Sequence, residues 1–509
     1  MKKSVVLLLV FTLMLSIFVM GCTQPQETNG TTITVNGQTY TGTLPKYIFL
    51  FIGDGMSYPQ IQITNYYLTV QGYNGQTPNI LTSQNNLTFL NFPVTGSIQT
   101  YDSTSFAPDS SSTATAMATG HKTYSSYLGV SEDGFKKYET IAEKLKKQMN
   151  YKVGIVTSVP LNHATPGAFY AHQTSRSKYY AIGGELIKSG FDYFAGGDLL
   201  EAVPLQGQDL YSKAKDAGYK IVRTQAEAAA LTQADGKVIV IGEHLGGSDI
   251  ADGALNYEID RAEGEWALAD YVSKGIEMLD NDTGFFMMVE GGKIDWTGHC
   301  NDPATAVQEV IAFNNAIQKA VDFYNAHPDE TLIVVTGDHE TGGMTLGYAG
   351  TKYDTFLDNL NNQKISYAKY NNEYVTKYAA EKTPFGTVMS DITAFFGLTA
   401  PKSAAGPADG SMELSAYEFQ LLKDAYDATL TVGAGNATGE DYLLYGSYEP
   451  LTVAITHIMA NKSGLSYTSF AHTGLPTAVF AIGAGAELFD GYYDNTGIFF
   501  NLAALTGVN

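Results

Sequence analysis

The sequence predicts an α/β fold with a large, mainly parallel central β-sheet and helices on both faces of that sheet. Short apolar runs, rich in β-branched and aromatic residues, alternate with segments of helical periodicity along most of the chain. Strands that alternate with helices form parallel sheets covered on both faces. The chain has 509 residues, of which 44% are hydrophobic, so it can build the core that such a sheet needs.

The predicted strands are apolar runs that stop at Gly, Asp, Glu or Thr, and they comprise residues 47–55, 152–158, 285–292, 331–340 and 477–485. Helical periodicity marks residues 140–148, 270–279 and 306–325. Ligands of parallel sheets bind beyond the carboxyl ends of the strands. Several polar residues follow the ends of these runs and are therefore expected at one edge of the sheet: Asp54, Glu290, Asp338 and His339.

The first 21 residues are predicted to be an export signal. Lys2 and Lys3 precede an uninterrupted apolar run that ends at Gly21 and Cys22. A cysteine behind a small residue is typical of a lipoprotein signal, in which Cys22 becomes the lipidated first residue of the mature chain. A single uncleaved membrane anchor is the alternative, because the run is near the lower length limit for spanning a bilayer. Both interpretations predict an exported protein, periplasmic or on the cell surface.

Three further regions follow the predicted signal. Residues 22–45 are polar and rich in Gly and Thr, as expected of a tether, and Asn36-Gly37 predicts a small hairpin within it. Residues 46–509 form the predicted main domain. Within that domain, residues 351 to about 450 have few strand signals and are interpreted as an insertion.

The net charge argues against some classes of binding partner, and the cysteine content argues against a disulfide framework. The formal net charge is −22, which argues against a nucleic-acid partner and against binding to anionic lipid, so membrane contact is expected only through the N-terminus. The net charge does not exclude an anionic substrate, because bound metal ions can supply local positive charge. Cys22 and Cys300 are the only cysteines, so no intrachain disulfide framework is expected.

Several acidic residues and histidines have the spacing of metal ligands. In VEGGKIDWTGH (289–299), a helix that begins after Gly292 would put Asp295 and His299 on one face, where they can bind one metal ion. A helix-capping aspartate and an exposed histidine are the alternative for this segment. There are further candidate metal ligands in two other segments. They are the Asp338-His339 pair at a strand end and His472 in a Gly-flanked turn.

Oxygen donors suggest a second kind of metal site. Asp54 follows an almost unbroken hydrophobic strand, and a carboxylate placed there usually has a cation to satisfy it. Thr165 and Glu290 are further candidate oxygen ligands, although a threonine before proline is more often a plain turn residue. Histidine and aspartate ligands favour zinc, whereas glutamate and threonine oxygens favour a harder ion such as magnesium.

The segment PDSSSTATAMATG contains a candidate nucleophile. It predicts a helix from about Ser110 to Gly120. Backbone N–H groups and the dipole at a helix N-terminus favour negative charge, and a nearby zinc ion makes a serine alkoxide accessible near neutral pH. A helix-capping serine is the alternative. In FYAHQTSRS (169–177), Arg176 can hold two phosphate oxygens at once, whereas a surface salt bridge is the alternative.

Together, these motifs resemble the alkaline phosphatase family. They occur in the expected order and span nearly all of residues 46–509: IGDGM, PDSSSTATAMATG, NHATP followed by AHQTSR, VEGGKIDWTGH, TGDHE and AHTG. The resemblance implies a three-layer sandwich of the alkaline phosphatase type and a catalytic domain that hydrolyses small phosphate monoesters. It also suggests a homodimer.

The resemblance assigns roles to individual residues. Ser110 matches the nucleophile that forms a phosphoserine, and Arg176 matches the arginine that binds the phosphate. The implied cofactors are two zinc ions and one magnesium ion. The implied ligands are Asp295, His299 and His472 for one zinc, Asp54, Asp338 and His339 for the second zinc, and Asp54, Thr165 and Glu290 for magnesium. His163 and Trp296 occupy positions that vary in the family, and His163 suggests a role beside the magnesium ligands or an altered metal preference.

Two other kinds of function compete with this interpretation. A phosphodiesterase or phosphonate hydrolase could share a two-zinc core, but Thr165, Glu290 and Arg176 favour a terminal, dianionic phosphate. A sulfatase is disfavoured because no cysteine stands at the nucleophile position. The rival from a different class is a surface lipoprotein that binds phosphate or metal without turnover, for which replacement of Ser110 would leave function intact.

Overall fold

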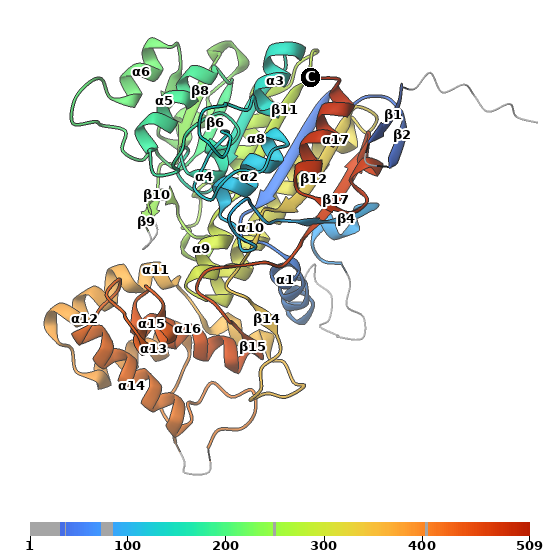
Figure 1. Cartoon of the computed structure of the whole chain (residues 1–509). Coiled ribbons are helices and arrows are strands. Elements are labelled where there is room, and N and C mark those ends of the chain that lie inside the picture. Colours follow the sequence, from blue (N-terminus) through green and yellow to red (C-terminus); the bar gives the residue numbers. More distant parts are fainter. Residues whose placement is uncertain (1–30, 36, 73–84, 248–250, 403–405) are drawn as a thin grey trace, which may run out of the picture.

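The computed structural model describes residues 31–35, 37–72, 85–247, 251–402 and 406–509 (Figure 1). The predicted export signal, Cys22 and the alternative membrane anchor lie outside these residues. Within the described ranges, no helix combines the length and apolar character needed to cross a bilayer.

A ten-stranded sheet forms the centre of the molecule, in the order β18-β4-β17-β12-β3-β11-β5-β6-β8-β7. Only β17 pairs antiparallel with its neighbours, and the remaining pairs are parallel, so the predicted mainly parallel sheet is confirmed. The strands are β3 (Tyr47–Gly53), β4 (Val94–Gln99), β5 (Lys152–Thr157), β6 (Tyr193–Gly196), β7 (Lys220–Val222), β8 (Val238–Ile241), β11 (Phe285–Gly291), β12 (Thr331–Gly337), β17 (Thr477–Gly483) and β18 (Gly491–Asp494).

Helices cover both faces of this sheet, as the alternating side chains of β3 illustrate. Phe49 and Phe51 pack into one core with α1 (Tyr58–Gln71), α8 (Leu268–Leu279) and α10 (Pro303–Ala326). Ile48 and Leu50 point to the other face. There they pack with α2 (Ser110–Thr119), α3 (Ile141–Met149), α5 (Tyr179–Ser189), α6 (Leu210–Asp216) and α17 (Thr496–Thr506). The three helices predicted from periodicity are thus present as α3, α8 and α10.

Shorter elements complete the α/β body. They are the helices α4 (Ala164–Gly167), α7 (Gln225–Ala229) and α9 (Lys293–His299), and the strand pairs β9 (Leu245–Gly247) with β10 (Asp252–Leu255), β13 (Glu340–Thr341) with β16 (His472–Thr473), and β14 (Thr345–Leu346) with β15 (Leu465–Ser466). The strands β1 (Thr31–Val35) and β2 (Gln38–Gly42) form an antiparallel hairpin, as Asn36-Gly37 predicted. Its Ile33 and Tyr40 pack against the body.

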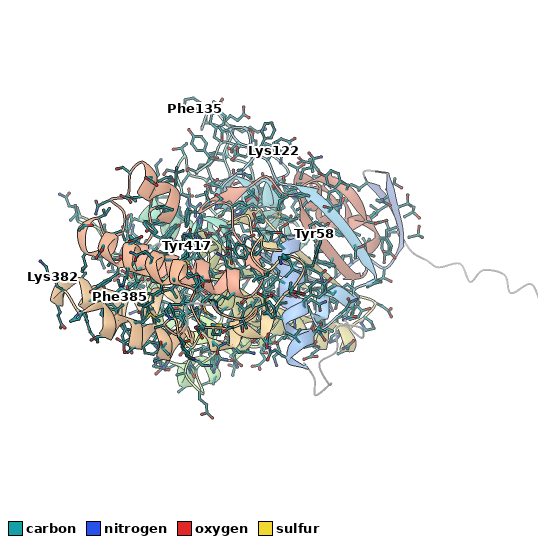
Figure 2. All side chains as sticks on the ribbon, turned by 90° about the horizontal axis from the view of Figure 1, so that it is seen from below. Tyr58, Lys122, Phe135, Lys382, Phe385 and Tyr417 are labelled. Atoms are coloured by element: carbon teal, nitrogen blue, oxygen red, sulfur yellow. The ribbon has the colours of Figure 1, made fainter. Side chains whose placement is uncertain are left out.

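A helical lobe lies below the sheet in Figure 1 and has its own hydrophobic core. It contains α11 (Tyr367–Tyr370), the π-helical turn η7 (Asn371–Val375), α12 (Thr376–Glu381), α13 (Phe385–Phe396), α14 (Ala416–Thr431), α15 (Glu440–Tyr445) and α16 (Pro450–Lys462). In the view from below, Phe385 and Tyr417 lie on this lobe, whereas Phe135 lies on a projection of the body (Figure 2). Because α16 contributes Leu451 and Ile455 to the lobe's core, the lobe continues beyond residue 450.

Candidate active site

The candidate residues meet at one edge of the sheet. The strands β3, β11 and β12 are parallel neighbours, and Gly53 at the end of β3 pairs with both Gly291 and Gly337. The residues at and just after these strand ends therefore share one edge, as the sequence predicted. Strand β17 runs the opposite way, so its start lies at this same edge. His472, five residues before β17, reaches the site for that reason.

The three consecutive serines at the start of α2 have different environments. Asp109 is the N-cap, and its carboxylate accepts the Ser112 N–H at 3.0 Å. The Ser111 hydroxyl donates to Asp109 at 2.6 Å, and the Ser112 hydroxyl donates to Asp102 at 2.7 Å. Ser110 is therefore not the capping residue, which excludes the alternative considered from the sequence. Its hydroxyl points instead into the site.

Asp54, Asp338 and His339 form a buried group that we call the serine-side cluster. One potential ligand atom from each residue lies within 4.8 Å of the others. The Ser110 Oγ atom is 3.3 Å from Asp54 Oδ1 and 3.1 Å from His339 Nε2. The Gly55 N–H donates to Asp338 Oδ1 at 3.1 Å, which fixes that carboxylate. The cluster therefore brings three potential metal ligands against one hydroxyl group.

Asp295, His299 and His472 form a second group of the same kind, here called the two-histidine cluster. Asp295 and His299 lie on α9 at the predicted i, i+4 spacing. His299 Nδ1 is 2.7 Å from the Phe470 carbonyl oxygen, and His472 Nδ1 is 2.5 Å from that of Pro108. A carbonyl oxygen can only accept, so each Nδ1 carries a proton, and in the neutral imidazole each Nε2 would present its lone pair to a cation. These two Nε2 atoms lie 3.2 Å apart, an arrangement that a shared cation would stabilise.

Asn301 holds the loop that orients His299. Its side-chain amide donates to the Gly298 carbonyl at 2.7 Å and to the Ser469 carbonyl at 2.9 Å, and its oxygen lies 2.7 Å from His457 Nε2 on α16. The side chain is buried, and the backbone has a left-handed φ of 53°. Asn301 therefore ties α9 and the helical lobe to the segment whose Phe470 carbonyl fixes the tautomer of His299.

Asp54, Thr165 and Glu290 form a third group, the oxygen cluster. The Thr165 hydroxyl donates to Asp54 Oδ2 at 3.1 Å, and the Thr157 hydroxyl donates to Glu290 Oε2. Glu290 Oε1 is buried and has no hydrogen-bond partner within the described part of the chain. A buried carboxylate oxygen without a partner is costly unless a cation satisfies it. Because Asp54 belongs to two clusters, it can bridge two cations.

Buried negative charge makes the site suitable for cations. Burial raises the pKa of Glu290 and of Asp338 to about 7 each, and burial together with the neighbouring carboxylates raises the pKa of Asp54 well above its usual value. Burial also holds the pKa of His339 well below its usual value, so this imidazole is neutral and free to act as a ligand. These groups could be ionised together near neutral pH only with compensating positive charge. The residues therefore fit metal ions, with nitrogen and carboxylate ligands in two clusters and oxygen ligands in the third.

Arg176 lies beside the start of α2. Its Nη1 donates to Asp109 Oδ2 at 3.1 Å. Burial opposes ionisation of Asp109, but Arg176 and several hydrogen bonds lower the pKa of this carboxyl to about 2. The Nη2 atom lies 3.5 Å from His163 Nε2, and Trp296 packs against the His163 ring in a T-shaped pair with 5.8 Å between centroids. Burial and the adjacent guanidinium lower the pKa of His163 to about 3, so the imidazole is neutral. These contacts use only part of the five N–H donors of Arg176.

Sequence reasoning missed two residues that support the clusters. The Thr341 hydroxyl donates to Asp295 Oδ1 at 2.5 Å and lies 3.3 Å from His339 Nδ1, so it joins the two clusters. Its position two residues after His339 was a signal for this role. Asn301 has the same spacing from His299, but its partners Ser469 and His457 come from segments far away in the sequence, so its role could not be predicted.

Comparison with known proteins agrees with this geometry. The family model described as alkaline phosphatase matches residues 45–192 and 198–395. Alkaline phosphatase 4 of Bacillus subtilis (strain 168) is 31% identical over 459 residues, which are 88% of this chain and 86% of that protein. The crystal structure of the cold-active alkaline phosphatase from the psychrophile Shewanella sp. aligns with a TM-score of 0.71 and 27% identity, over 91% of this chain and 100% of the other.

The fold extends to more distant proteins. The structure of Thermus thermophilus alkaline phosphatase, 23% identical, aligns with a TM-score of 0.73 over 92% of each chain. The family model and the similarity to Alkaline phosphatase 4 identify the family, and the two groups of potential metal ligands agree with it. The chain belongs to the alkaline phosphatase family of metal-dependent phosphomonoester hydrolases.

Proposed function

We propose that this protein hydrolyses phosphate monoesters through a phosphoserine intermediate at Ser110. One observation carries the proposal. The Ser110 Oγ atom, released from helix capping by Asp109, is 3.1 Å from His339 Nε2 and 3.3 Å from Asp54 Oδ1 in the serine-side cluster. Its position at the first turn of α2 adds backbone N–H groups and the helix dipole, which stabilise negative charge.

We assign one zinc ion each to the serine-side and two-histidine clusters, and one magnesium ion to the oxygen cluster. The ligands are Asp54, Asp338 and His339 for the first zinc, Asp295, His299 and His472 for the second, and Asp54, Thr165 and Glu290 for magnesium. When bound, the cations neutralise phosphate charge, stabilise the leaving oxygen and lower the pKa of the serine hydroxyl and of water.

Arg176 and Ser110 have separate roles in the proposed reaction. Arg176 binds two phosphate oxygens and orients the phosphorus toward Ser110. The Ser110 oxygen forms a bond to phosphorus while the ester P–O bond breaks, and the alcohol gains the proton that the serine has lost. Water then attacks the phosphoserine, and the Ser110 oxygen leaves and recovers a proton. The products are the alcohol and inorganic phosphate.

Replacement of Arg176 by Ala should lower kcat/KM for a phosphate monoester by about 10- to 100-fold, the usual loss for charge-assisted hydrogen bonds. Inhibition by inorganic phosphate should weaken in parallel, because the same oxygens are bound. Initial rates with and without added phosphate measure both effects. Arg223→Ala is the matched control, since Arg223 makes a two-bond pair with Asp198 at 2.9 and 3.1 Å. Equal losses in the two variants would contradict the role of Arg176.

Rates on a monoester and a diester of the same alcohol separate this function from that of a phosphodiesterase. We expect faster hydrolysis of the monoester, because Arg176 and the oxygen cluster suit a terminal dianionic phosphate. Faster hydrolysis of the diester would overturn the proposed substrate class. No turnover of either ester with zinc and magnesium supplied would favour a protein that only binds phosphate or metal.

Asn301→Gly should weaken metal binding at the two-histidine cluster by about 10-fold, as losses of groups that orient a ligand commonly do. Glycine tolerates the left-handed backbone at this position but cannot hold the loop that carries the Phe470 carbonyl. Titration of the metal-free protein with zinc in a calorimeter measures the affinities of both zinc sites. Asn150→Gly is the control, because Asn150 is also left-handed, with φ 55°, but is exposed. An equal loss of zinc affinity at both sites would contradict the specific role of Asn301 at the two-histidine cluster.

We further propose that the protein is exported and held at a membrane through lipid on Cys22, and that it forms a homodimer. The support is the N-terminal sequence for the first statement and the family for the second. Cys22→Ser should move the enzyme from the membrane fraction to the soluble fraction without loss of specific activity. An unchanged membrane association would instead favour an uncleaved N-terminal anchor.

A further inference from the structure

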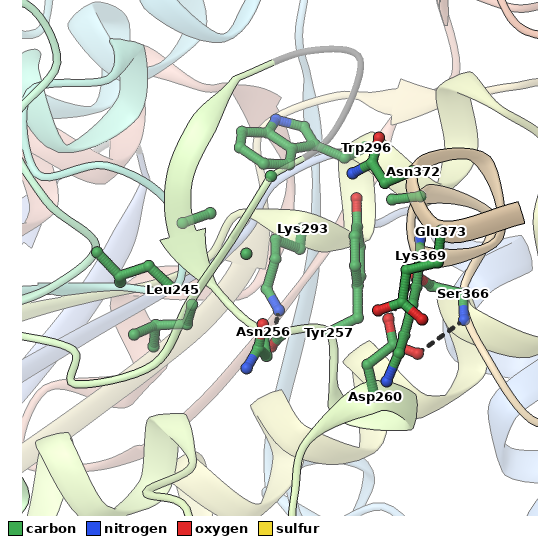
Figure 3. A pocket seen from close by; sticks show the side chains of 15 residues that line it. Leu245, Asn256, Tyr257, Asp260, Lys293, Trp296, Ser366, Lys369, Asn372 and Glu373 are labelled. Atoms are coloured by element: carbon green, nitrogen blue, oxygen red, sulfur yellow. Dashed lines mark hydrogen bonds between the residues drawn. The ribbon is translucent and has the colours of Figure 1, made fainter. Parts of the chain in front are cut away.

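A cavity of about 320 Å³ lies between the α/β body and the helical lobe. The body contributes the strands β9 and β10, residues 256–260 and α9, whereas the lobe contributes α11 with its N-cap and η7 (Figure 3). Its volume is at the lower end of the roughly 300–1,000 Å³ of small-molecule sites, and such sites are common where two structural units meet. The cavity is therefore large enough for one small group.

Trp296 connects this cavity to the proposed phosphate site. Its indole lines the cavity and also forms a T-shaped pair with the His163 ring, with 5.8 Å between centroids. His163 in turn lies 3.5 Å from Arg176. Two contacts thus separate the cavity from the side chain that we assign to the phosphate, so occupation of the cavity is expected to affect Trp296 first.

The lining of the cavity combines aromatic rings with groups that can both donate and accept hydrogen bonds. Tyr257 and Trp296 lie beside the Asn372 side chain, and Lys369 and Glu373 lie beside Asp260 (Figure 3). A hydroxyl group both donates and accepts hydrogen bonds, and the carbon atoms of a polyol can pack against aromatic rings. Amides, an ammonium group and carboxylates next to aromatic rings therefore suit a ligand with several hydroxyl groups. A purely apolar ligand would leave these polar groups without water and without partners.

The charges at the cavity disfavour an anionic ligand. The Lys293 ammonium group is buried, donates to the Asn256 carbonyl and pairs with Glu309 at 3.3 Å. Burial raises the pKa of Asp260, whereas Ser366, Lys369 and Lys293 stabilise its charged form. Two ammonium groups, those of Lys293 and Lys369, and two carboxylates, those of Asp260 and Glu373, therefore line the cavity, and Glu309 behind the lining pairs with Lys293. A second phosphate group would meet no net positive charge.

We propose that this cavity binds an uncharged, hydroxyl-rich group of the size of one sugar ring. The group is either the alcohol portion of a phosphomonoester, an interpretation that rests on the proposed function, or a free polyol. Asn372 and Lys369 of the lobe supply hydrogen bonds, and Trp296 supplies an apolar wall. The helical lobe would thus contribute to ligand selection, a role separate from its support of the two-histidine cluster through Asn301.

Binding can be measured without catalysis, because the chain has only two tryptophans. In a Trp266→Phe background, addition of glucose should change the fluorescence of Trp296. Asn372→Ala and Lys369→Met should each weaken the apparent affinity for glucose by about fivefold, as expected for the loss of one hydrogen bond. Lys377→Met is the matched control, since Lys377 lies on α12 and does not line the cavity. Absence of a saturable signal with glucose and with glucose 6-phosphate would overturn the proposal.

Kinetics distinguish the two sources of the group. If the alcohol portion binds, the Asn372 and Lys369 variants should raise KM for glucose 6-phosphate about fivefold and leave kcat/KM for 4-nitrophenyl phosphate within about twofold. If a free polyol binds, both esters should be hydrolysed as by the wild type while glucose affinity falls. Both results support a hydroxyl-binding cavity. Variants that change neither glucose affinity nor any KM contradict it. A wild type that hydrolyses neither ester refutes the proposed function but leaves the fluorescence test intact.

Discussion

Replacement of Ser110 by Ala is expected to lower kcat for phosphomonoesters by at least about 10³-fold, since a variant without its nucleophile keeps only binding and electrostatic stabilisation. The Ser110 hydroxyl is buried and lies against Asp54 and His339, where a cation and the first turn of α2 would stabilise its ionised form. Alanine fits the same helix position, because Asp109 caps the helix. The fold and the metal content should therefore persist, and steady-state rates alongside metal analysis test both statements.

The neighbouring serines provide matched controls. Ser111→Ala and Ser112→Ala each remove one hydrogen bond to an aspartate carboxylate, and they should change kcat by less than about 10-fold. Acid quench of the wild type with labelled substrate should trap phosphate on Ser110, and none should be trapped in Ser110→Ala. Residual kcat near that of the wild type, or label on another residue, would exclude Ser110 as the nucleophile.

Much of the site could be predicted because it depends on local sequence and on one rule of topology. The pattern of β3, β11 and β12 identifies buried strands, and parallel strands present their carboxyl ends at one edge. Asp54 and the Asp338-His339 pair follow directly from this rule. The i, i+4 spacing of Asp295 and His299 needs only one helical turn, which α9 provides.

The remaining features depend on contacts between distant segments. His472 was a candidate from its motif, but the antiparallel direction of β17, which brings it to the same edge as Asp54 and Asp338, is not revealed by an apolar run alone. The role of Asn301 requires α9, residue 469 and α16 to meet at one side chain. The core of the helical lobe could not be anticipated either, because composition indicated only the absence of strands. These features were inaccessible because tertiary packing, not local propensity, determines them.

Glu290→Gln is expected to stabilise the metal-free protein at alkaline pH while it weakens magnesium binding. Burial raises the pKa of Glu290 from 4.5 to about 7 in the metal-free fold. Between these values the folded state binds more protons than the unfolded state, so stability falls as the pH rises from about 4.5 to about 7. Glutamine carries no charge and keeps an acceptor for the Thr157 hydroxyl. At pH 8 the metal-free variant should therefore be more stable by up to about 3 kcal/mol, with no difference near pH 4.

Chemical denaturation of chelator-treated proteins at pH 4 and pH 8, with and without added magnesium, measures this effect. Magnesium should stabilise the wild type more than Glu290→Gln, because the substitution replaces one of the two charged ligands of the oxygen cluster by a neutral amide and leaves only Asp54 charged. Glu309→Gln is the control with the opposite sign. Glu309 is also buried and its pKa is also raised, but it pairs with Lys293, so its replacement leaves an uncompensated ammonium group and destabilises the fold. If metal-free Glu290→Gln is no more stable than the wild type at pH 8, Glu290 is already neutralised by other groups, and the oxygen cluster does not need a cation.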